Sequence, residues 1–438
     1  MATDILIYDG AVRTEQGWLS PGYVAIQDGR IQTVAAGRPD EELLKSARQV
    51  IRAEGKALIP GLTNGHTHFS QTFMRGLAAG RPLLRWLKEL IWPLQSAMSV
   101  EEMRLAALLG LVENLKCGCT SVVQHHKVTT TRDHTGVVME AAKQVGINCV
   151  IARLWSDKGV NSEDATAILD EMEEWFALTR DSADLPSRPF LHFASGPATP
   201  WRCSADCLQK THDLAVKNGS FTHIHVAETR DEIQMSLDEY GLTPIRWLDT
   251  LGILGPQSQI VHAVWVDEGE IELLARRGAL VVHCPVSNAV MGSGIAPIPA
   301  MLDQGVTLRL GSDGPASNDT QDLFETTKMA LSLARAHLVD ASVLQPAQLL
   351  SIAVGGQDII PGSVADLILV NLAHERAMPV HDLDSALVLC SHGSDVDTVI
   401  VRGNILMKDR RLLHIDEEAL LKECIQAVIL LRKRAGLD

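Results

Sequence analysis

Two histidines stand one residue apart where an apolar run ends near the start of the chain. The run 57–66, ALIPGLTNGH, leads into the tripeptide H-T-H, which is formed by His66 and His68. Alternate residues of a β-strand point to the same side, so both imidazoles can face one ion. Imidazole is a preferred ligand of zinc and also suits iron. This spacing therefore indicates a pair of metal ligands.

Side chains of the same kind end four more apolar runs. His223 and His225 end 221–226, His262 ends 259–263, His283 lies in 279–285, and Asp313 ends 307–313. One histidine at the end of one strand is usually structural. Histidines at four strand ends and an aspartate at a fifth indicate a shared site.

The chemistry that such a set supports is hydrolysis. A bound ion lowers the pKa of water toward ~7 and so generates hydroxide at neutral pH. Asp313 can accept the proton of this water while it touches the metal, and His262 can orient the hydroxide or stabilise a developing alkoxide. Glu228 follows His225 in an H-x-x-E pattern and can pass a proton to the substrate as a general acid.

The elements that must position these residues form a repeating pattern. Apolar, strand-like runs alternate with segments of helical periodicity such as 100–118 and 267–278, which favours parallel strands joined by helices. Eight units of this kind predict a (β/α)8 barrel, in which active sites lie at the carboxyl ends of the strands. The eight runs span residues 57–66, 120–124, 148–155, 189–195, 221–226, 259–263, 279–285 and 307–313.

Both ends of the chain read as short β-strands. The stretches 5–14, 22–37 and 50–51 alternate around Asp-Gly turns, and 365–372, 386–391 and 397–406 precede a final helix. A barrel takes about 250 residues, and neither end can bury a core alone. We therefore predict one composite β-sandwich domain from residues 1–58 and 358–438, with the barrel inserted at 59–357.

Charge and cysteine content indicate which partners this protein can bind and in which compartment it is expected. The formal net charge of −15 argues against nucleic acid or an anionic membrane as a partner. The sequence has no secretory signal pattern and no apolar run near the ~18 residues of a membrane span. The eight cysteines include no C-x-x-C, so reduced thiols and a cytoplasmic protein are expected.

Taken together, these motifs resemble the amidohydrolase superfamily, and more closely its heterocycle aminohydrolase branch. The resemblance rests on H-T-H, H-x-x-E, the histidine of the sixth strand, the seventh-strand HCPVSN and GSDGPASND, with IQDGRI and VADLILV at the ends. That branch contains guanine, 8-oxoguanine, isoxanthopterin and S-adenosylhomocysteine deaminases and the triazine hydrolases. It is similar to this sequence over essentially the whole chain.

The resemblance implies roles for particular residues. The metal ligands would be His66, His68, His225 and Asp313, Glu228 would transfer protons, His262 and Asp313 would handle the water, and His283 would lie near the substrate. The fourth run, 189–195, lacks the lysine that a two-metal barrel with a carboxylated lysine has there. We therefore expect one Zn²⁺, with Fe²⁺ as the alternative, and a homodimer or higher homo-oligomer.

The expected reaction is attack of metal-bound hydroxide on a small nitrogen heterocycle of 8-oxopurine, guanine, pterin or aminotriazine type, with release of ammonia. Adenosine-type members carry P-H-A-P after the fourth strand, but 196–200 reads GPATP, which disfavours nucleosides. The segment 286–301 resembles a triazine chlorohydrolase, so loss of chloride or an alkylamine from a triazine-like ring is the alternative. The expected substrate-binding residues are Gln71, Trp86, Trp92, His125, His126 and His283.

Overall fold

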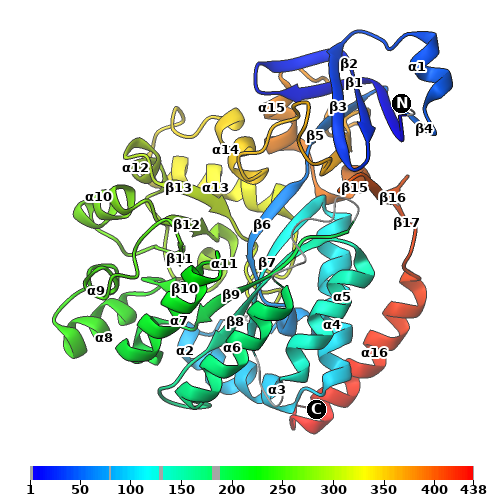
Figure 1. Ribbon diagram of the computed structural model, residues 1–438. Helices are drawn as coiled ribbons and strands as arrows, with labels where there is room; N and C mark the ends of the chain where they lie inside the picture. Colours follow the sequence, from blue (N-terminus) through cyan, green and yellow to red (C-terminus); the bar gives the residue numbers. More distant parts are fainter. Residues whose placement is uncertain (1–2, 78–79, 128–131, 180–187, 438) are drawn as a thin grey trace.

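The computed structural model describes residues 3–77, 80–127, 132–179 and 188–437, and its centre is a barrel of eight parallel strands (Figure 1). Each strand pairs with the next one in the chain, in the order β6 to β13. The predicted (β/α)8 fold is therefore confirmed. The barrel strands are β6 (Leu62–Thr67), β7 (Cys119–Lys127), β8 (Asn148–Trp155), β9 (Leu191–Pro197), β10 (Thr222–Val226), β11 (Ser258–His262), β12 (Leu280–His283) and β13 (Thr307–Leu310).

The first and last barrel strands meet without a regular ladder. The backbone N–H of Asp313 donates to the carbonyl of His66 at 2.9 Å, which ties the residues after β13 to β6. A Cβ on Gly65 would lie 2.9 Å from the carbonyl oxygen of Leu310. Glycine at this position therefore permits the close approach of the two strands, which brings His66 beside Asp313.

Helices cover the outside of the barrel, and local sequence sets where several of them begin. The Ser99 side chain and Glu102 form a capping box at the start of α4, and Asp267 and Glu270 do the same for α10. The covering helices are α4 (Val100–Lys116), α5 (Asp133–Val145), α6 (Ala165–Thr179), α7 (Ala205–Lys217), α8 (Arg230–Tyr240), α9 (Pro244–Thr250), α10 (Glu268–Arg277), α12 (Ile298–Asp303), α13 (Leu323–Leu338) and α14 (Pro346–Ala353). The short α11 (Pro285–Val290) lies at the carboxyl end of β12.

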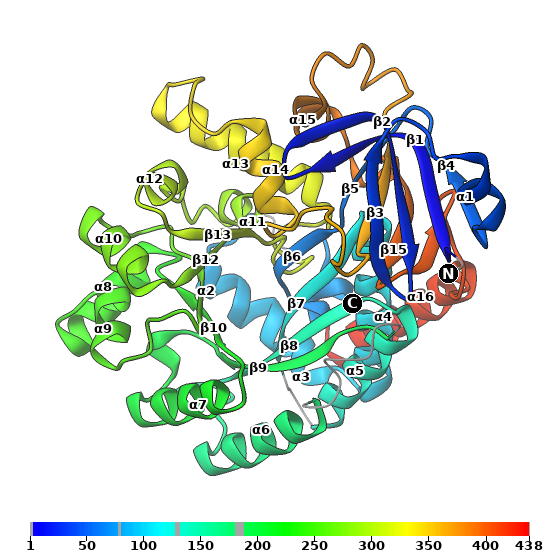
Figure 2. The same cartoon turned by 45° about the horizontal axis from the view of Figure 1, so that its top comes forward.

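A second, mixed sheet draws strands from both ends of the chain, as predicted (Figure 2). Its strand order is β17-β16-β15-β14-β5-β1-β2-β3, and β4 pairs with β1. Buried side chains from both ends, Ile7, Val24, Leu58, Leu369 and Ile400 among them, share one hydrophobic core. The strands are β1 (Ile5–Thr14), β2 (Gly17–Gln27), β3 (Arg30–Ala36), β4 (Gln49–Arg52), β5 (Lys56–Pro60), β14 (Leu367–Asn371), β15 (Val396–Val401), β16 (Asn404–Lys408) and β17 (Arg411–Leu412).

Two of the predicted strands are wrong in detail. The run 57–66 is two strands, because β5 pairs with β14 in the terminal sheet and only β6 enters the barrel. The stretch 386–391 is no strand; Ala386–Cys390 forms a turn of π-helix that continues the short α15 (Leu383–Ser385). Periodicity cannot separate a short apolar strand from a short buried helix. The domain limits at 58/59 and 357/358 stay a prediction.

The remaining helices are peripheral to the barrel wall. The C-terminal helix α16 (Glu417–Arg434) runs antiparallel to α4, with Glu417 bonded to Lys116 at one end and Arg434 to Glu102 at the other. Short elements follow β6, namely η1 (Phe69–Met74), α2 (Leu83–Trp86), η2 (Leu87–Ile91) and α3 (Trp92–Ala97), and α1 (Glu41–Ser46) precedes β4. Among the described residues, no helix combines the length and apolar character that crossing a membrane requires.

Candidate metal centre

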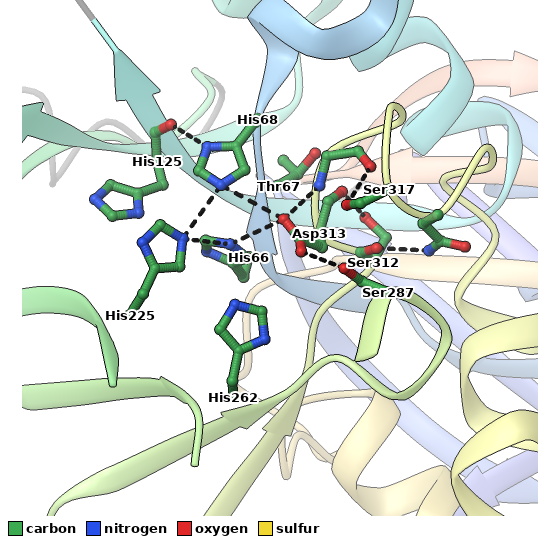
Figure 3. A network of polar contacts seen from close by, with 12 residues as sticks. His66, Thr67, His68, His125, His225, His262, Ser287, Ser312, Asp313 and Ser317 are labelled. Carbon is green, nitrogen blue, oxygen red and sulfur yellow. Dashed lines mark hydrogen bonds and ion pairs between the residues drawn. The ribbon is translucent and has the colours of Figure 1, made fainter. Parts of the chain in front are cut away.

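Four side chains at the carboxyl ends of β6, β10 and β13 point toward one another (Figure 3). The Nε2 atom of His225 lies 3.3 Å from the Nε2 atoms of both His66 and His68. Oδ1 of Asp313 lies 3.3 Å from Nε2 of His66 and 3.4 Å from Nε2 of His68. Zinc–nitrogen bonds of about 2.0–2.1 Å give a tetrahedron with edges of about 3.3–3.4 Å. These four donor–donor distances therefore match edges of a tetrahedral zinc site.

The orientations of the His68 and His225 rings leave their Nε2 atoms free to bind a cation. Nδ1 of His68 donates to the carbonyl of His125 at 2.7 Å, and Nδ1 of His225 donates to the carbonyl of Ala198 at 2.7 Å. A proton on Nδ1 leaves Nε2 with its lone pair. Burial also lowers the pKa of His66 to about 4, which keeps its imidazole neutral. The histidines are thus in the state that a metal ligand must have.

His66 is oriented by a second histidine instead of a carbonyl. Its Nδ1 lies 2.8 Å from Nε2 of the buried His223, whose own Nδ1 lies 3.0 Å from Oε1 of Gln259. Gln259 accepts from His223 Nδ1–H, so His223 Nε2 can accept from His66 Nδ1–H. This chain, called here the Gln259–His223–His66 relay, leaves Nε2 of His66 as the lone-pair nitrogen. His223 therefore lies behind His66 and not beside it in the ligand set.

Asp313 is held by two short hydrogen bonds. Ser287 Oγ donates to its Oδ2 at 2.6 Å, and the backbone N–H of Gly314 donates to its Oδ1 at 2.6 Å. Burial alone would raise its pKa, but the nearby His66, His68 and His262 rings hold the pKa well below the usual carboxyl range. Asp313 is therefore a carboxylate, as metal binding requires.

Backbone strain gathers around the same centre. Ala227, His262 and Asp313 have φ angles of +56°, +75° and +61°, in the left-handed region that residues with a Cβ rarely adopt. Strained residues of this kind cluster at active sites, where the surrounding structure fixes them. In this protein the strained backbone turns the side chains of His262 and Asp313 from the strand ends toward the site. Glu228 follows the strained Ala227 and lies in the same site.

Glu228 and His262 form a proton-handling pair beside the predicted ligands. Oε2 of Glu228 lies 3.6 Å from Nε2 of His262, and Ser293 Oγ donates to Oε1 at 3.0 Å. Burial raises the pKa of Glu228 above its usual value, and the nearby His262 reverses only part of this shift. Nδ1 of His262 donates to Oδ1 of Asn288 at 2.9 Å, which directs Nε2 toward Glu228. A protonated Glu228 can deliver a proton from Oε2.

These groups line a cavity with an empty volume of about 820 Å³, the space at its mouth included. The predicted residues Gln71, Trp86 and Trp92 line it together with the catalytic candidates. Oε1 of Gln71 is buried and has no hydrogen-bond partner among the residues that the structure describes. The cavity thus offers aromatic faces, and the unpartnered acceptor of Gln71 is buried in its wall.

His125, His126 and His283 are not among the residues that line this cavity. The ring of His125 lies in the histidine cluster, with Nε2 3.1 Å from the carbonyl oxygen of Gly196. Both ring nitrogens of His126 are buried without a partner in the described part of the chain. His283 is buried too, and burial lowers its pKa to about 3. The structure does not bring these three to the cavity wall.

The sequence reasoning missed several residues that line the cavity or support its groups. Ser287 and Asn288 lie in α11, shortly after β12 ends at His283 in HCPVSN, so their position after a strand end was an available signal. Lys127 ends β7 in the same way. Trp201 and Arg202 belong to a short 3-10 turn, Pro200–Arg202, and no periodicity marks them. The missed lining residues include Lys127, Trp201, Arg202, Glu232, Ser287 and Met291.

The residues present fit a metal ion. Three neutral imidazoles and a carboxylate with tetrahedral spacing are a donor set that zinc accepts. Strand β9 contains no lysine, as expected for a site that lacks a carboxylated lysine. Ring nitrogens of His125 also lie within 4.8 Å of the ligand atoms of His66, His68 and His225. His66, His262 and Asp313 form a second group whose ligand atoms lie within 4.8 Å of one another, so Asp313 is the carboxylate that would offset part of the charge of a cation here.

Comparisons with known proteins agree with this geometry. The chain is 34% identical over 431 residues to a 5'-deoxyadenosine deaminase of Methanothermobacter thermautotrophicus. This alignment covers 96% of this chain and 97% of that protein. It is 33% identical over 444 residues to a 5-methylthioadenosine/S-adenosylhomocysteine deaminase of Pelotomaculum thermopropionicum, covering 98% and 99%. A crystal structure of an adenosine deaminase from Xanthomonas campestris with bound zinc superposes with a TM-score of 0.89 at 28% identity, covering 98% and 99%.

The match extends to a family model. The model of the Amidohydrolase family matches residues 57–406, which include every barrel strand and every predicted metal ligand. Because this match spans most of the chain and the relatives cover nearly all of it, the chain belongs to the amidohydrolase family.

Proposed function

We propose that this protein is a zinc-dependent aminohydrolase that replaces the exocyclic amino group of a nitrogen heterocycle by oxygen and releases ammonia. The observation that carries the proposal is the near-tetrahedral set of His66, His68, His225 and Asp313, with Glu228 and His262 beside it. The relatives named above are deaminases, which supports the same reaction class. The homo-oligomeric state and the cytoplasmic location stay predictions.

The protein groups divide the proton transfers between them. A zinc ion in this site supplies a water molecule whose pKa is lowered toward neutrality. Asp313, with Nε2 of His262 oriented toward the same water, would accept one proton of that water as its oxygen bonds to the ring carbon. Oε2 of Glu228 would donate a proton to the adjacent ring nitrogen. The proton on Asp313 would pass to the amino group, which leaves as ammonia, and the proton of the new hydroxyl would pass to Glu228 as the carbonyl forms.

Ring identity has two candidates. The relatives named above are deaminases of adenosine-type nucleosides. A 6-aminopurine nucleoside is the first candidate. Free rings of 8-oxopurine, guanine, pterin or aminotriazine type are the second, because Ala198 stands where adenosine-type members have a histidine. Gln71 Oε1, a buried acceptor without a partner in the described chain, suits a ring N–H in either case.

The experiment is ammonia release by the zinc-loaded protein against both ring classes. The panel contains adenosine, 5'-deoxyadenosine, S-adenosylhomocysteine, guanine, 8-oxoguanine, isoxanthopterin and an aminotriazine, with Glu228→Gln protein as the matched control. We expect a kcat/KM of about 10⁴ M⁻¹s⁻¹ or more for one class. If no compound releases ammonia although zinc is bound, the deaminase proposal is wrong, and chloride and alkylamine release from a triazine would be measured.

A further inference from the structure

The C-terminal helix α16 has one apolar face that packs on the rest of the protein. Figure 1 shows α16 at the outer edge of the molecule, beside α4. The buried residues of this helix recur every three or four positions, as expected for a surface helix that lies on a core. They are Leu420, Cys424, Ala427 and Leu431. The remaining sides of such a helix are normally polar.

α16 also has a second apolar face, and this one is exposed. Leu421, Ile425 and Ile429 are 50%, 58% and 56% exposed. These three residues and the half-buried Val428 follow one another at three- and four-residue steps around Ile425, so they form one line along the helix. We call these four residues the α16 stripe. Single exposed apolar side chains are common on protein surfaces, whereas a contiguous apolar patch indicates an interaction site.

An apolar groove with an empty volume of about 680 Å³ adjoins the α16 stripe. Val428 belongs to both the stripe and the groove. The other apolar residues that line the groove include Phe73, Leu77, Leu90 and Leu94. Apolar surface therefore extends beyond the helix itself, and a partner that covers the stripe can also fill the groove.

Charged residues of opposite sign close the α16 stripe at its two ends. Glu418 lies seven residues before Ile425 and Arg432 lies seven residues after it. Seven residues are close to two helical turns, so both charges lie in line with the stripe. Glu418 pairs only with the exposed Lys422, at 2.7 Å. Arg432 donates to the carbonyl of Leu437 at 3.1 Å, and it forms no ion pair with any residue that the structure describes.

We propose that the α16 stripe binds the α16 stripe of a second copy of this chain, antiparallel and about a two-fold axis at Ile425. On such an axis the same patch serves both subunits, and Ile425 contacts Ile425 of the partner subunit. Leu421 then lies opposite Ile429 of the partner subunit, and Glu418 lies opposite Arg432 of the partner subunit. The surface assigned here goes beyond the proposed deamination and does not depend on it.

Charge complementarity is the reason to choose a second copy as the occupant. In the antiparallel pair each arginine at a stripe end meets a glutamate, and two ion pairs flank an apolar centre. The antiparallel helix dipoles add a further attraction. A parallel pair would bring like charges together at both ends. A different protein would require no match of spacing and sign between the two halves of one helix.

The first test measures the mass of the full-length protein in solution by analytical ultracentrifugation over a wide range of concentration. Wild type should be a dimer. Ile425→Glu places two carboxylates against each other on the axis and should raise the dimer Kd on the order of 100-fold, as for a residue at the centre of an interface. Leu430→Glu is the matched control, because Leu430 is also 58% exposed on the same helix but lies outside the stripe. It should leave the Kd within about 3-fold of wild type, as for a residue outside the interface.

The second test exchanges the charges and so reports on orientation. Glu418→Arg alone, or Arg432→Glu alone, sets like charges against each other in two places and should weaken the dimer on the order of 10-fold. The double variant Glu418→Arg with Arg432→Glu restores both ion pairs and should recover most of the loss. A parallel pair predicts no such recovery.

A cross-link tests the contact in a variant that keeps the surface uncharged. Under mild oxidation, chains of the Ile425→Cys variant should be linked in pairs, because a residue on the axis meets its own copy. Chains of the Leu430→Cys variant and of wild type should not be linked. Thermal unfolding of every variant should match that of wild type at a concentration at which all are monomers.

Four results would overturn the inference. They are a wild type that stays monomeric at every concentration, a dimer that Ile425→Glu leaves intact, a loss in Leu430→Glu as large as that in Ile425→Glu, and a double charge variant no better than the single ones. Failure of the Ile425→Cys chains to link would also refute the axis, whatever the stability of the charged variants.

Discussion

The Gln259–His223–His66 relay predicts that a residue outside the ligand set controls zinc affinity. In His223→Phe the aromatic ring is kept, but His66 Nδ1–H loses the acceptor that lies 2.8 Å away. His66 is 0% exposed, so water cannot replace that acceptor without a rearrangement. The His66 ring is then free to change tautomer or to turn. Either change removes the Nε2 lone pair from the centre.

The size of the effect follows from this burial. A buried donor left without a partner costs about 1–3 kcal/mol. At about 1.4 kcal/mol per tenfold change, zinc should bind about 5- to 150-fold more weakly. That range agrees with the 10- to 100-fold effect usual for groups that orient a metal ligand. Gln259→Leu acts one step further away and should cost less, whereas Gln259→Glu keeps an acceptor for His223 Nδ1–H and should retain affinity.

The assay is competition for zinc against a chromophoric chelator, with thermal unfolding of the metal-free proteins measured in parallel. His192→Phe is the matched control, because His192 lies on the neighbouring β9 and stacks on Phe190. The relay is refuted if His223→Phe binds zinc within twofold of wild type. It is also refuted if Gln259→Glu loses as much affinity as Gln259→Leu, or if the loss in His223→Phe only tracks a lower melting temperature of the metal-free protein.

Other predictions concern the ligands, the general acid and a buried histidine. His225→Ala and Asp313→Ala should each lose bound zinc and all ammonia release, and a metal-free variant with full activity would contradict the ligand assignment. Glu228→Gln should keep its zinc, measured by elemental analysis, and lose about 10²-fold or more in rate; near-normal turnover would remove Glu228 from the mechanism. His283 has a folded-state pKa of about 3 against about 6.5 unfolded. Its neutral form therefore adds stability above pH 6.5, and about 2 kcal/mol of this is lost by pH 5. Denaturant unfolding at both pH values should show a smaller loss in His283→Gln than in wild type, and equal losses would contradict this.

The barrel could be predicted because its pattern is repeated eight times. Each buried parallel strand leaves an apolar run, and each covering helix leaves a 3.6-residue period, so single errors do not change the fold class. The same repetition located the candidate ligands, since His66, His225 and Asp313 all follow such runs. The pattern does not show which strands pair with each other. For this reason the apolar run that contains β5 was assigned wholly to the barrel.

The contacts that support the site could not be predicted from the sequence, because they join residues that are far apart in the chain. His223 looked like a second inward-facing histidine, but its role depends on meeting Nδ1 of His66 from a strand 157 residues away in the chain. Arg202 lies in an irregular turn, and its place on the cavity wall depends on how that turn packs. His125, His126 and His283 were expected at the substrate because of their neighbours in sequence. Their burial away from the cavity wall is set by packing, which no local motif encodes.

The central claim, a single zinc ion that drives deamination, is tested most directly by adding zinc to metal-free protein and measuring ammonia release from the active compound of the panel. The account predicts no release without metal, a linear rise with added zinc, and a plateau at one equivalent per chain. Release that persists in metal-free protein, or a plateau at two equivalents, would contradict the site assigned to His66, His68, His225 and Asp313.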